Sequence, residues 1–471
     1  MALRPIHDAI AAYYRHPAVR RRIAEYCGGI DGFPAGFSAL GLAGYGGREA
    51  RHAADMAPVA APATDFPRLL DEGADICRSM ADGHGALVQL DIDYVNPDDP
   101  AEVYRDPPAC FARLEPVYRA VRDTLSAFGV PALELMTGRG YHFTARAPLG
   151  SLLHSELVAL GCRAPALLAR AAGRAADESS ATMDAAHEGA GRLVEFLAHH
   201  VIGLLRGRIP VPVTAADVPP PGRGPFICLD CTAYGDPLRS RHVRCAFSSH
   251  QKAALEGLDV VGPPFLLALP RNGRDLAELL GARGDPEASA LLAERTEVHI
   301  PDVDEAGAWL GAYASSSLAR FHRRFDEAAG TSSADAAAEY ARIDPPALPS
   351  CVRQPLDAPN PRLLVPLALR VITLVLWARG WPPRRIADLV RSRYEADHGW
   401  GDLWQRYDPA ARADFYVRVF AAGAATGLDD AFSFTCASQQ QRGGCPGGEC
   451  GHELGALYPD HSALRAMGAR P

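Results

Sequence analysis

Two aspartates, Asp91 and Asp93, directly follow a short apolar stretch at residues 86–90, and their spacing suits metal chemistry. The stretch is short, contains a β-branched valine and follows Asp82-Gly-His-Gly, which predicts a buried strand. Because alternate side chains of a strand share a face, both carboxylates would lie side by side. Such a pair is repulsive unless a cation or proton lies between its members, and Mg²⁺ or Mn²⁺ prefers oxygen ligands of this kind. For this motif alone, a strand end with two solvated acids is the simpler interpretation.

Two further segments carry residues that could act with these acids. A second apolar run, residues 226–229, ends at Asp230. Residues 132–136 and 141–145 are predicted strands on either side of the turn Thr137-Gly-Arg-Gly140, and His142 lies just beyond that turn. Backbone N–H groups of Gly-rich turns can bind phosphate oxygens. Three acids could therefore hold metal ions beside groups that bind a triphosphate, the arrangement used for in-line attack on a phosphate.

A basic segment follows Asp230 and contains Arg241, Arg244, Ser248, His250 and Lys252. If the segment is extended, the even spacing of the last four residues places them on one face. Lys252 is the single lysine of the chain, among 48 Lys and Arg residues together. A compact ammonium and a planar guanidinium are not interchangeable, so a lone lysine indicates a position where the ammonium is required. The alternative is that Lys252 has no special role and is present by chance in a chain that otherwise uses arginine.

The order and spacing of these motifs resemble the archaeo-eukaryotic primase superfamily, especially the catalytic small subunit of archaeal primases. The resemblance covers about residues 86–252, although Thr137 replaces the usual serine and the turn is one residue shorter than in the archaeal pattern. It implies that the catalytic metals are bound by Asp91, Asp93 and Asp230. It also implies a set of residues that bind the incoming nucleotide: Thr137, Arg139, His142, Arg241, Arg244, Ser248, His250 and Lys252.

Near the C-terminus, one cysteine precedes a predicted helical stretch and three follow it: Cys351, Cys436, Cys445 and Cys450. This pattern resembles the iron–sulfur domain of the primase large subunit over residues 345–458, and it implies a [4Fe–4S] cluster. The last two cysteines are closer together here than in that subunit. A zinc ion bound by three cysteines with Cys351 or His452 is therefore a competing prediction, and unligated thiols are a third.

Length and composition limit the class of protein. The chain has 471 residues, 48% of them hydrophobic, which is enough for two or three domains with a sizeable core. A net charge of −8 excludes a uniformly basic nucleic-acid coat but not a local basic groove. Eleven cysteines without a secretion signal indicate reduced thiols and a cytoplasmic protein. The most apolar run, residues 363–377, is interrupted by Pro366 and Arg370, so we expect a buried helix and no membrane partner.

The sequence also predicts the elements that position these residues. Apolar periodicity predicts helices at 6–14, 17–26, 65–80 and 110–128, and mostly helical structure at 151–206. Residues 208–225 read as a loop, residues 255–345 as a mixture of short strands and helices, and residues 330–349 as a linker. Helices are expected again from Cys351 to about residue 458, one of them starting after Gly380-Trp-Pro-Pro.

Taken together, the predicted fold class is α+β. An RRM-like antiparallel-sheet catalytic domain occupies residues 1–340, and an all-α metal-cluster domain occupies residues 345–458. The resemblance implies a DNA primase-polymerase, a nucleotidyltransferase that uses Mg²⁺ or Mn²⁺ together with the iron–sulfur cluster. Its expected partners are a single-stranded DNA template, nucleoside triphosphates, and a helicase or other replication proteins.

Two other functions remain open. One is a catalytically silent DNA-binding factor of replication or defence, which would have no reason to retain three acids. The other is a metal-dependent glycosyltransferase, in which Asp-x-Asp binds a nucleotide-sugar diphosphate. That alternative does not account for Asp230 or for the series from Arg244 to Lys252.

Overall fold

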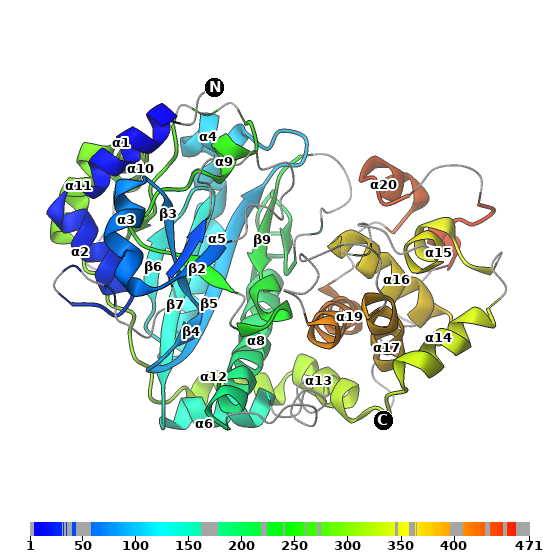
Figure 1. Ribbon diagram of the computed structural model, residues 1–471. Helices are drawn as coiled ribbons and strands as arrows, with labels where there is room; N and C mark the ends of the chain where they lie inside the picture. The colour runs from blue at the N-terminus through cyan, green and yellow to red at the C-terminus, as the bar shows by residue number, and fades with distance from the viewer. Residues whose placement is uncertain are drawn as a thin grey trace. The chain divides into compact units, whose positions relative to one another are not determined.

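In the computed structural model the chain forms two compact units, and each consists of two separate segments (Figure 1). The first unit contains Met1–Val158 and Leu238–Ala306, and the second contains Ala159–Pro237 and Gly307–Pro471. The structure describes residues 4–30, 32, 34, 40–43, 58–161, 178–216, 218, 224–238, 241–258, 260, 262–270, 275–343, 347–357, 363, 365–395, 408–428, 434–445 and 450–457.

Helices α1 (Arg4–Tyr14) and α2 (Pro17–Tyr26) open the first unit and confirm the two N-terminal predictions. Pro17 at the first helical position of α2 suits a site where no backbone N–H is needed. Both helices lie beside α11 (Pro286–Arg295) at one flank of the unit, and α10 (Leu276–Gly284) precedes α11 (Figure 1). The hydroxyl groups of Tyr13 and Ser289 share a hydrogen bond of 2.8 Å, which joins α1 to α11 across 276 residues of chain.

One sheet of this unit is antiparallel, in the order β10-β3-β1-β2. Its strands are β10 (His242–Arg244), β3 (Asp75–Ser79), β1 (Leu40–Ala43) and β2 (Pro58–Ala61). The prediction of one helix over residues 65–80 is wrong. A short helix, α3 (Phe66–Asp71), is followed by Gly73, whose φ of 64° favours glycine and ends the helix. Residues 75–79 then pair with strands on both sides, which the local sequence does not reveal.

The strands that the first unit contributes to the second sheet are antiparallel, in the order β11-β6-β7-β5, and β4 also pairs with β5. They are β11 (Leu267–Ala268), β6 (Leu133–Met136), β7 (Gly140–Pro148), β5 (Gly85–Val95) and β4 (Ala81–Asp82). The predicted strands at 86–90, 132–136 and 141–145 are thereby confirmed.

The long helix α5 (Pro107–Ala127) covers one face of this second sheet and confirms the helix predicted at 110–128. The rings of Phe111 and Tyr118 pack against Tyr141, and Tyr118 also packs against Phe143. Since alternate residues of β7 point to opposite faces, His142 points away from α5. The face without α5 is therefore the one that can carry polar side chains.

The remaining short elements of the described chain complete the two units. They are η2 (Ala63–Asp65), α4 (Glu102–Arg105), α6 (Leu152–Gly161), η3 (Thr232–Gly235) and α9 (Lys252–Leu255). In the second unit, β8 (Val213–Thr214) and β9 (Phe226–Asp230) form a parallel pair. The strand predicted before Asp230 is thus confirmed.

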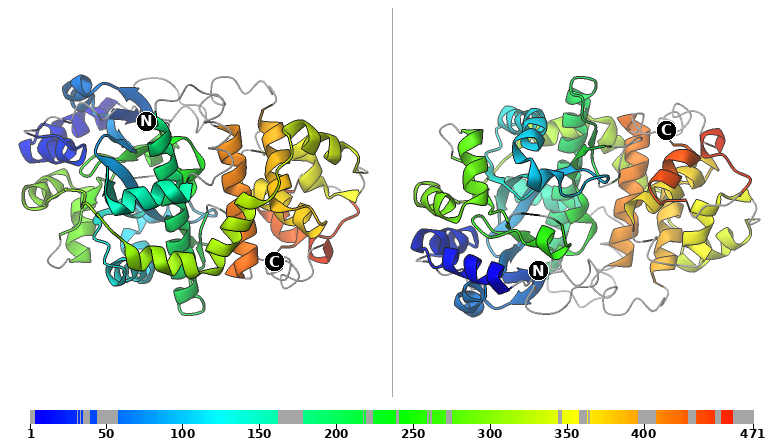
Figure 2. Two further views of the ribbon diagram at one scale, coloured as in Figure 1. Left: turned by 90° about the horizontal axis from the view of Figure 1, so that it is seen from below. Right: turned by 90° about the horizontal axis from the view of Figure 1, so that it is seen from above.

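The other elements that the structure describes in the second unit are mostly helices. Its helices are α8 (Glu178–Leu205), α12 (Gly307–Ser315), α13 (Ser317–Glu327), α14 (Ser333–Ala341), α15 (Ser350–Asp357), α16 (Pro366–Ala378), α17 (Pro383–Tyr394), α19 (Pro409–Thr426), α20 (Cys436–Gln441) and α21 (Leu454–Leu457). Helices α16, α17 and α19 pack together, with α19 orange in both views of Figure 2. The apolar run at 363–377 is the buried α16, as predicted.

The predicted linker at residues 330–349 is wrong. These residues contain α14, which is capped by Ser332 and packs against α17. The mixture of short strands and helices predicted for residues 255–345 agrees with the structure, which has strand β11 and helices α10 to α14 there. Small and polar residues at 330–336 resemble a linker in composition, whereas the Ser332 cap and the buried Ala336 and Tyr340 make a helix there.

Buried ion pairs join the helices of the second unit. Arg192 of α8 pairs with Asp326 of α13 at 2.5 Å, and Arg384 of α17 pairs with Asp414 of α19 at 2.7 Å. Removing one partner of such a pair would leave an uncompensated buried charge. No described helix is long and apolar enough to span a bilayer. The architecture as a whole is mixed α and β, as predicted.

Candidate functional site

Asp91 and Asp93 project from the face of β5 that faces away from α5. In the ladder, Asp91 lies opposite His142 and Asp93 lies opposite Gly140. The amide of Gln89 donates to Asp91 Oδ1 at 2.6 Å, and His142 Nε2 lies 3.5 Å from the same oxygen. Gln89 is itself buried and accepts a hydrogen bond from the hydroxyl of Thr144. The first acid is therefore oriented by neighbours on its own strand and on β7.

The turn between β6 and β7 is closed by its own threonine. Thr137 Oγ1 accepts the backbone N–H groups of Arg139 at 3.3 Å and of Gly140 at 3.0 Å, and Thr137 N donates to Gly140 O at 2.8 Å. These N–H groups point into the turn. The expectation that this turn offers its N–H groups to a phosphate is therefore wrong for Arg139 and Gly140, because a threonine hydroxyl already accepts both.

The side chain of Arg139 connects this turn to the acids. Its guanidinium donates to Asp93 Oδ2 at 2.7 Å, and the arginine side chain is 34% exposed while the aspartate side chain is 14% exposed. A charge-assisted hydrogen bond of this kind holds both groups in place. Arg139 thus lies beside the acid pair with part of its surface open to a ligand.

His250 is buried at the centre of a group of cations. Burial holds its pKa well below the usual value, and the positive charges of Arg244, Arg139, Lys252 and Arg283 lower it further. A neutral imidazole at neutral pH follows. The ring packs so closely on the preceding turn that a Cβ added to Gly138 would lie 2.5 Å from His250 Nδ1. Glycine at position 138 is required by this contact.

Lys252 begins α9 and lies 3.8 Å from Glu256, with 39% of its side chain exposed. The positive charge of Arg139 is the largest cause that lowers its pKa, followed by burial. The effect of Arg139 on both Lys252 and His250 indicates that these three residues share one electropositive neighbourhood beside Asp93.

Sequence reasoning missed Arg283, which belongs to the same neighbourhood. Its buried guanidinium donates to the carbonyl of Gly138 and, at 3.3 Å, to the carbonyl of Thr137, and it lies over the rings of Tyr104 and Phe111. Burial lowers its pKa to about 10. No local pattern marks this arginine, because its contacts are about 145 residues away in the chain.

The segment from Arg241 to Lys252 is not one extended strand, so that premise is wrong. Strand β10 ends at Arg244 and a turn follows, in which the buried Phe247 has a φ of 62°. A positive φ in a bulky residue requires strong tertiary support. Ser248 is consequently used inside the fold, where its hydroxyl accepts the backbone N–H of Ile76 at 2.7 Å.

The other predicted ligands of this segment have separate positions. Arg244 donates through Nε to Asp75 Oδ2 at 3.1 Å, and sequence reasoning did not single out that aspartate. The carbonyl of Arg241 accepts the backbone N–H of Met80 at 2.9 Å, which places this residue at the end of β3. Arg244, His250 and Lys252 are therefore the members of the predicted set that share the electropositive neighbourhood with Arg139.

Asp230 ends β9 in the second unit, where its Oδ1 accepts the backbone N–H of Thr232 at 2.8 Å. Asp91 and Asp93 belong to the first unit. The three-acid metal site thus stays a prediction. Among the residues that the structure describes, no group of three or more His, Cys, Asp or Glu side chains is arranged to hold a metal ion.

The four predicted cluster cysteines lie in one neighbourhood of the second unit. Burial raises the pKa of Cys351 to about 12, and the thiolate charges of Cys445, Cys436 and Cys450 raise it as well. The thiols of Cys436 and Cys450 both approach the carbonyl of His452, at 3.5 and 3.9 Å. In number and type these thiols fit a four-thiolate cluster. Among the described residues, however, their side chains are not arranged around a common metal position. Residues 446–449, between Cys445 and Cys450, lie outside the described chain.

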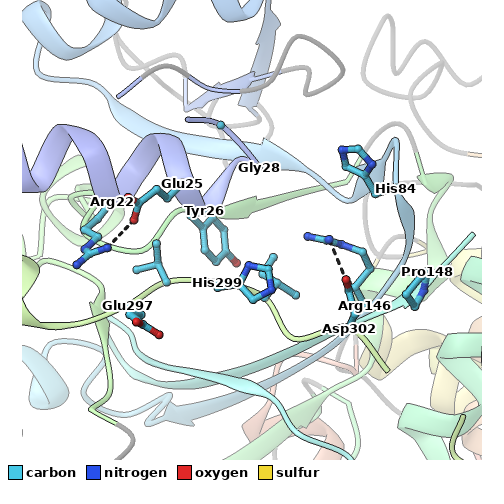
Figure 3. A pocket seen from close by; sticks show the side chains of 13 residues that line it. Arg22, Glu25, Tyr26, Gly28, His84, Arg146, Pro148, Glu297, His299 and Asp302 are labelled. Atoms are coloured by element: carbon cyan, nitrogen blue, oxygen red, sulfur yellow. Dashed lines mark hydrogen bonds and ion pairs between the residues drawn. The ribbon is translucent and has the colours of Figure 1, made fainter. Parts of the chain in front are cut away.

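A separate cavity of about 780 Å³ lies in the first unit, lined by charged and polar side chains that include His84, Arg146 and His299 (Figure 3). Its walls include Pro148, which lies opposite Gly85 in the β5–β7 ladder, whereas Asp93 lies opposite Gly140 at the other end. At about 3.3 Å per strand residue the two ends are about 26 Å apart. The cavity is therefore distinct from the acid pair.

Comparison of the chain with protein-family models, with curated proteins and with solved structures found no match.

Proposed function

We propose that this chain is a primase-polymerase, which joins nucleoside triphosphates on a single-stranded DNA template. The observation that carries the proposal is the meeting of opposite charges in the first unit. Asp91 and Asp93 lie on one strand face, and Arg139 links that face to the cations around His250. Acids that bind metal ions beside cations that bind a triphosphate are what nucleotidyl transfer requires.

In this proposal Asp91 and Asp93 would hold Mg²⁺ or Mn²⁺. The chemistry that such ions supply is activation of a 3′-hydroxyl and stabilisation of the departing pyrophosphate. The protein itself contributes the orientation of the carboxylates. Gln89 and His142 position Asp91, and Arg139 positions Asp93.

The triphosphate binds the cations on the other side of Arg139. Lys252 is half-exposed and Arg139 is 34% exposed, so both can contact a ligand. His250 is neutral and buried, so in this role it donates or accepts a single hydrogen bond and adds no charge. The second unit, in this proposal, would contain an iron–sulfur cluster bound by Cys351, Cys436, Cys445 and Cys450.

A primer-synthesis assay tests the proposal. The purified chain is incubated with circular single-stranded DNA, Mg²⁺ or Mn²⁺ and labelled ribo- or deoxynucleotides, with and without an annealed primer. We expect products whose composition follows the template. Incorporation without a template, or no incorporation while the chain still binds single-stranded DNA, would reject polymerisation, and the second result would favour the silent DNA-binding factor. Release of sugar from a nucleotide sugar would instead favour a glycosyltransferase.

A further inference from the structure

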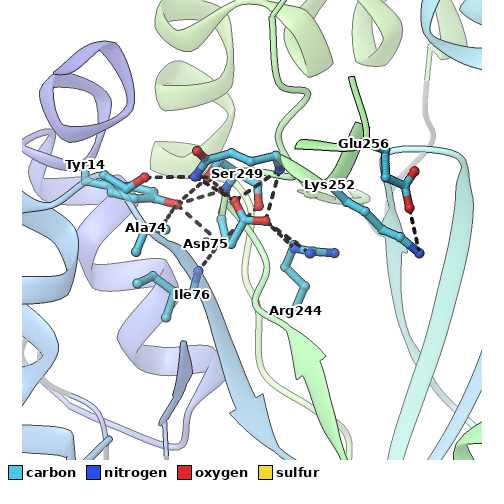
Figure 4. Close-up of polar contacts among 11 residues, drawn as sticks. Tyr14, Ala74, Asp75, Ile76, Arg244, Ser249, Lys252 and Glu256 are labelled. Atoms are coloured by element: carbon cyan, nitrogen blue, oxygen red, sulfur yellow. Dashed lines mark hydrogen bonds and ion pairs between the residues drawn. The ribbon is translucent and has the colours of Figure 1, made fainter. Parts of the chain in front are cut away.

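A buried carboxylate lies behind the cations of the candidate nucleotide site. Asp75 begins β3, and none of its surface is exposed to solvent. It is the centre of the polar contacts drawn in Figure 4, where the side chains of Tyr14, Ser249 and Arg244 converge on the start of β3. A fully buried carboxylate is stable only when its oxygens are satisfied by donors.

Both oxygens of Asp75 are saturated. Oδ1 accepts the hydroxyl of Ser249 at 2.6 Å and the side-chain amide of Gln251 at 3.0 Å. Oδ2 accepts the backbone N–H of Gln251 at 3.0 Å, and Arg244 approaches the same oxygen with Nε and Nη2, each at 3.1 Å. This carboxylate therefore holds a side chain of β10 and the backbone of residues 249–251 at once.

The residues that Asp75 holds are either predicted nucleotide ligands or direct neighbours of such ligands. Arg244 is 17% exposed, and its guanidinium plane is fixed because two of its nitrogens contact Asp75. His250 lies between Ser249 and Gln251, and Lys252 follows Gln251 directly. The hydroxyl of Tyr14 supports the same arrangement, since it accepts the backbone N–H of Ser249 at 2.9 Å and donates to Ala74 O at 2.9 Å.

We propose that Asp75 is the positioning residue of the triphosphate site: it aligns the Arg244 guanidinium and fixes the backbone that presents His250 and Lys252. This inference rests on the proposed nucleotide-binding role of those three residues. Asp75 itself contacts no substrate, because its oxygens are filled by protein donors and it is fully buried. Its effect is preorganisation, which limits the ordering that a bound triphosphate would otherwise have to impose.

The test compares Asp75→Asn with a matched control, Asp82→Asn. Like Asp75, Asp82 is a buried carboxylate of the first unit, and its Oδ2 lies 2.7 Å from Arg78 Nη2. Asp82 pairs with Gly85 at the start of β5, whereas Asp93 lies near the other end of that strand. Both substitutions should lower the melting temperature. Only Asp75→Asn should raise the KM for nucleotide, by about tenfold, with kcat and the affinity for single-stranded DNA within about twofold of wild type. Equal KM values for the two variants would overturn the positioning role.

A milder variant covers the case in which Asp75→Asn does not fold. Ser249→Ala removes one hydroxyl from the carboxylate and keeps its charge and its contact with Arg244, so we expect a KM about threefold above wild type. A double variant that combines Ser249→Ala with Arg244→Gln should raise KM less than the product of the two single effects, because both changes act through the Asp75 carboxylate. Unchanged KM in Ser249→Ala, or full additivity in the double variant, would count against the proposal.

The dissociation constant of a non-hydrolysable nucleoside triphosphate separates this inference from the proposed function. If the wild type binds the triphosphate and Asp75→Asn weakens binding about tenfold, but no polymer forms, polymerisation is rejected and the positioning role stands. If the wild type polymerises and Asp75→Asn behaves like Asp82→Asn, only the positioning role is rejected.

Discussion

The guanidinium of Arg139 donates to Asp93 Oδ2 at 2.7 Å, and the same arginine is the largest cause of the lowered pKa of Lys252. One side chain therefore links the acidic face of β5 to the cations around His250. The link depends on the β5–β7 register, which places Asp93 opposite Gly140, the residue after Arg139.

Asp91→Asn and Asp93→Asn should each lower nucleotide incorporation at least about a hundredfold, because loss of a metal-binding carboxylate removes several kcal/mol of stabilisation from the transition state. Asp98→Asn, which changes an exposed acid just beyond the same strand, is the control and should retain activity. Initial rates with Mg²⁺ and with Mn²⁺ are the measurement. Activity of Asp91→Asn equal to that of the control would reject the metal assignment.

The pKa of Lys252 should be measurable directly, because this is the single lysine of the chain. Its amine reacts with an acylating reagent only when deprotonated, and the positive charge of Arg139 favours deprotonation. The rate of Lys252 acylation should therefore rise at a lower pH than for a model lysine, and Arg139→Gln should move that rise toward higher pH. Mass spectrometry of the modified peptide reports the rate, and identical pH profiles in both proteins would contradict the proximity of Arg139.

The same lowered pKa predicts a pH dependence of nucleotide binding. A protonated Lys252 attracts phosphate, so the KM for nucleotide should rise as pH increases through its pKa, below the ordinary value of 10.5. Lys252→Arg should show a flatter profile because guanidinium stays charged, but a higher KM at neutral pH because the planar fork replaces a compact ammonium. If the KM of Lys252→Arg equals that of the wild type, the site does not require a lysine at this position.

Gly138→Ala should damage the site by crowding. The added methyl would lie 2.5 Å from His250 Nδ1, so the imidazole or the turn must move, which costs about 1–3 kcal/mol. We expect a lower melting temperature and a raised KM for nucleotide. Gly311→Ala is the matched control, because a Cβ there meets nothing within 4 Å in α12, and it should be neutral or stabilising. Equal behaviour of the two variants would show that the ring does not pack on this turn.

The cysteine site predicts a metal content. Protein purified without oxygen should be brown and contain about four irons, the count of a [4Fe–4S] cluster. Cys351→Ser should bleach it and destabilise the second unit, because a bound cluster adds folding free energy. Cys110→Ser, a buried cysteine of the first unit, should keep the colour. Colourless protein with about one zinc would reject the iron–sulfur cluster in favour of a Cys/His site, and absence of both metals would reject both.

Local patterns in the sequence were sufficient for most elements. The alternation at residues 86–94 determined that Asp91 and Asp93 share a face, because side chains of a strand alternate whatever surrounds them. Helices α1, α2, α5 and α16 follow from apolar periodicity and from prolines at helix starts, which are local effects, although α1 and α5 begin at Arg4 and Pro107, before the predicted residues 6 and 110.

Tertiary contacts decided the rest. Residues 75–79 form a strand instead of a helix because β1 and β10 pair with them, and those strands lie far away in the chain. Because Phe247 has a positive φ, the chain turns there and the side chain of Ser248 is buried against Ile76. The residues from Arg244 to Lys252 therefore do not share one face, as they would in an extended segment. Asp75 and Arg283 carry no sequence signal, since each acquires its role from partners about 145 to 176 residues away. Burial and pairing over such distances are properties of the packed fold, so no local pattern could predict them.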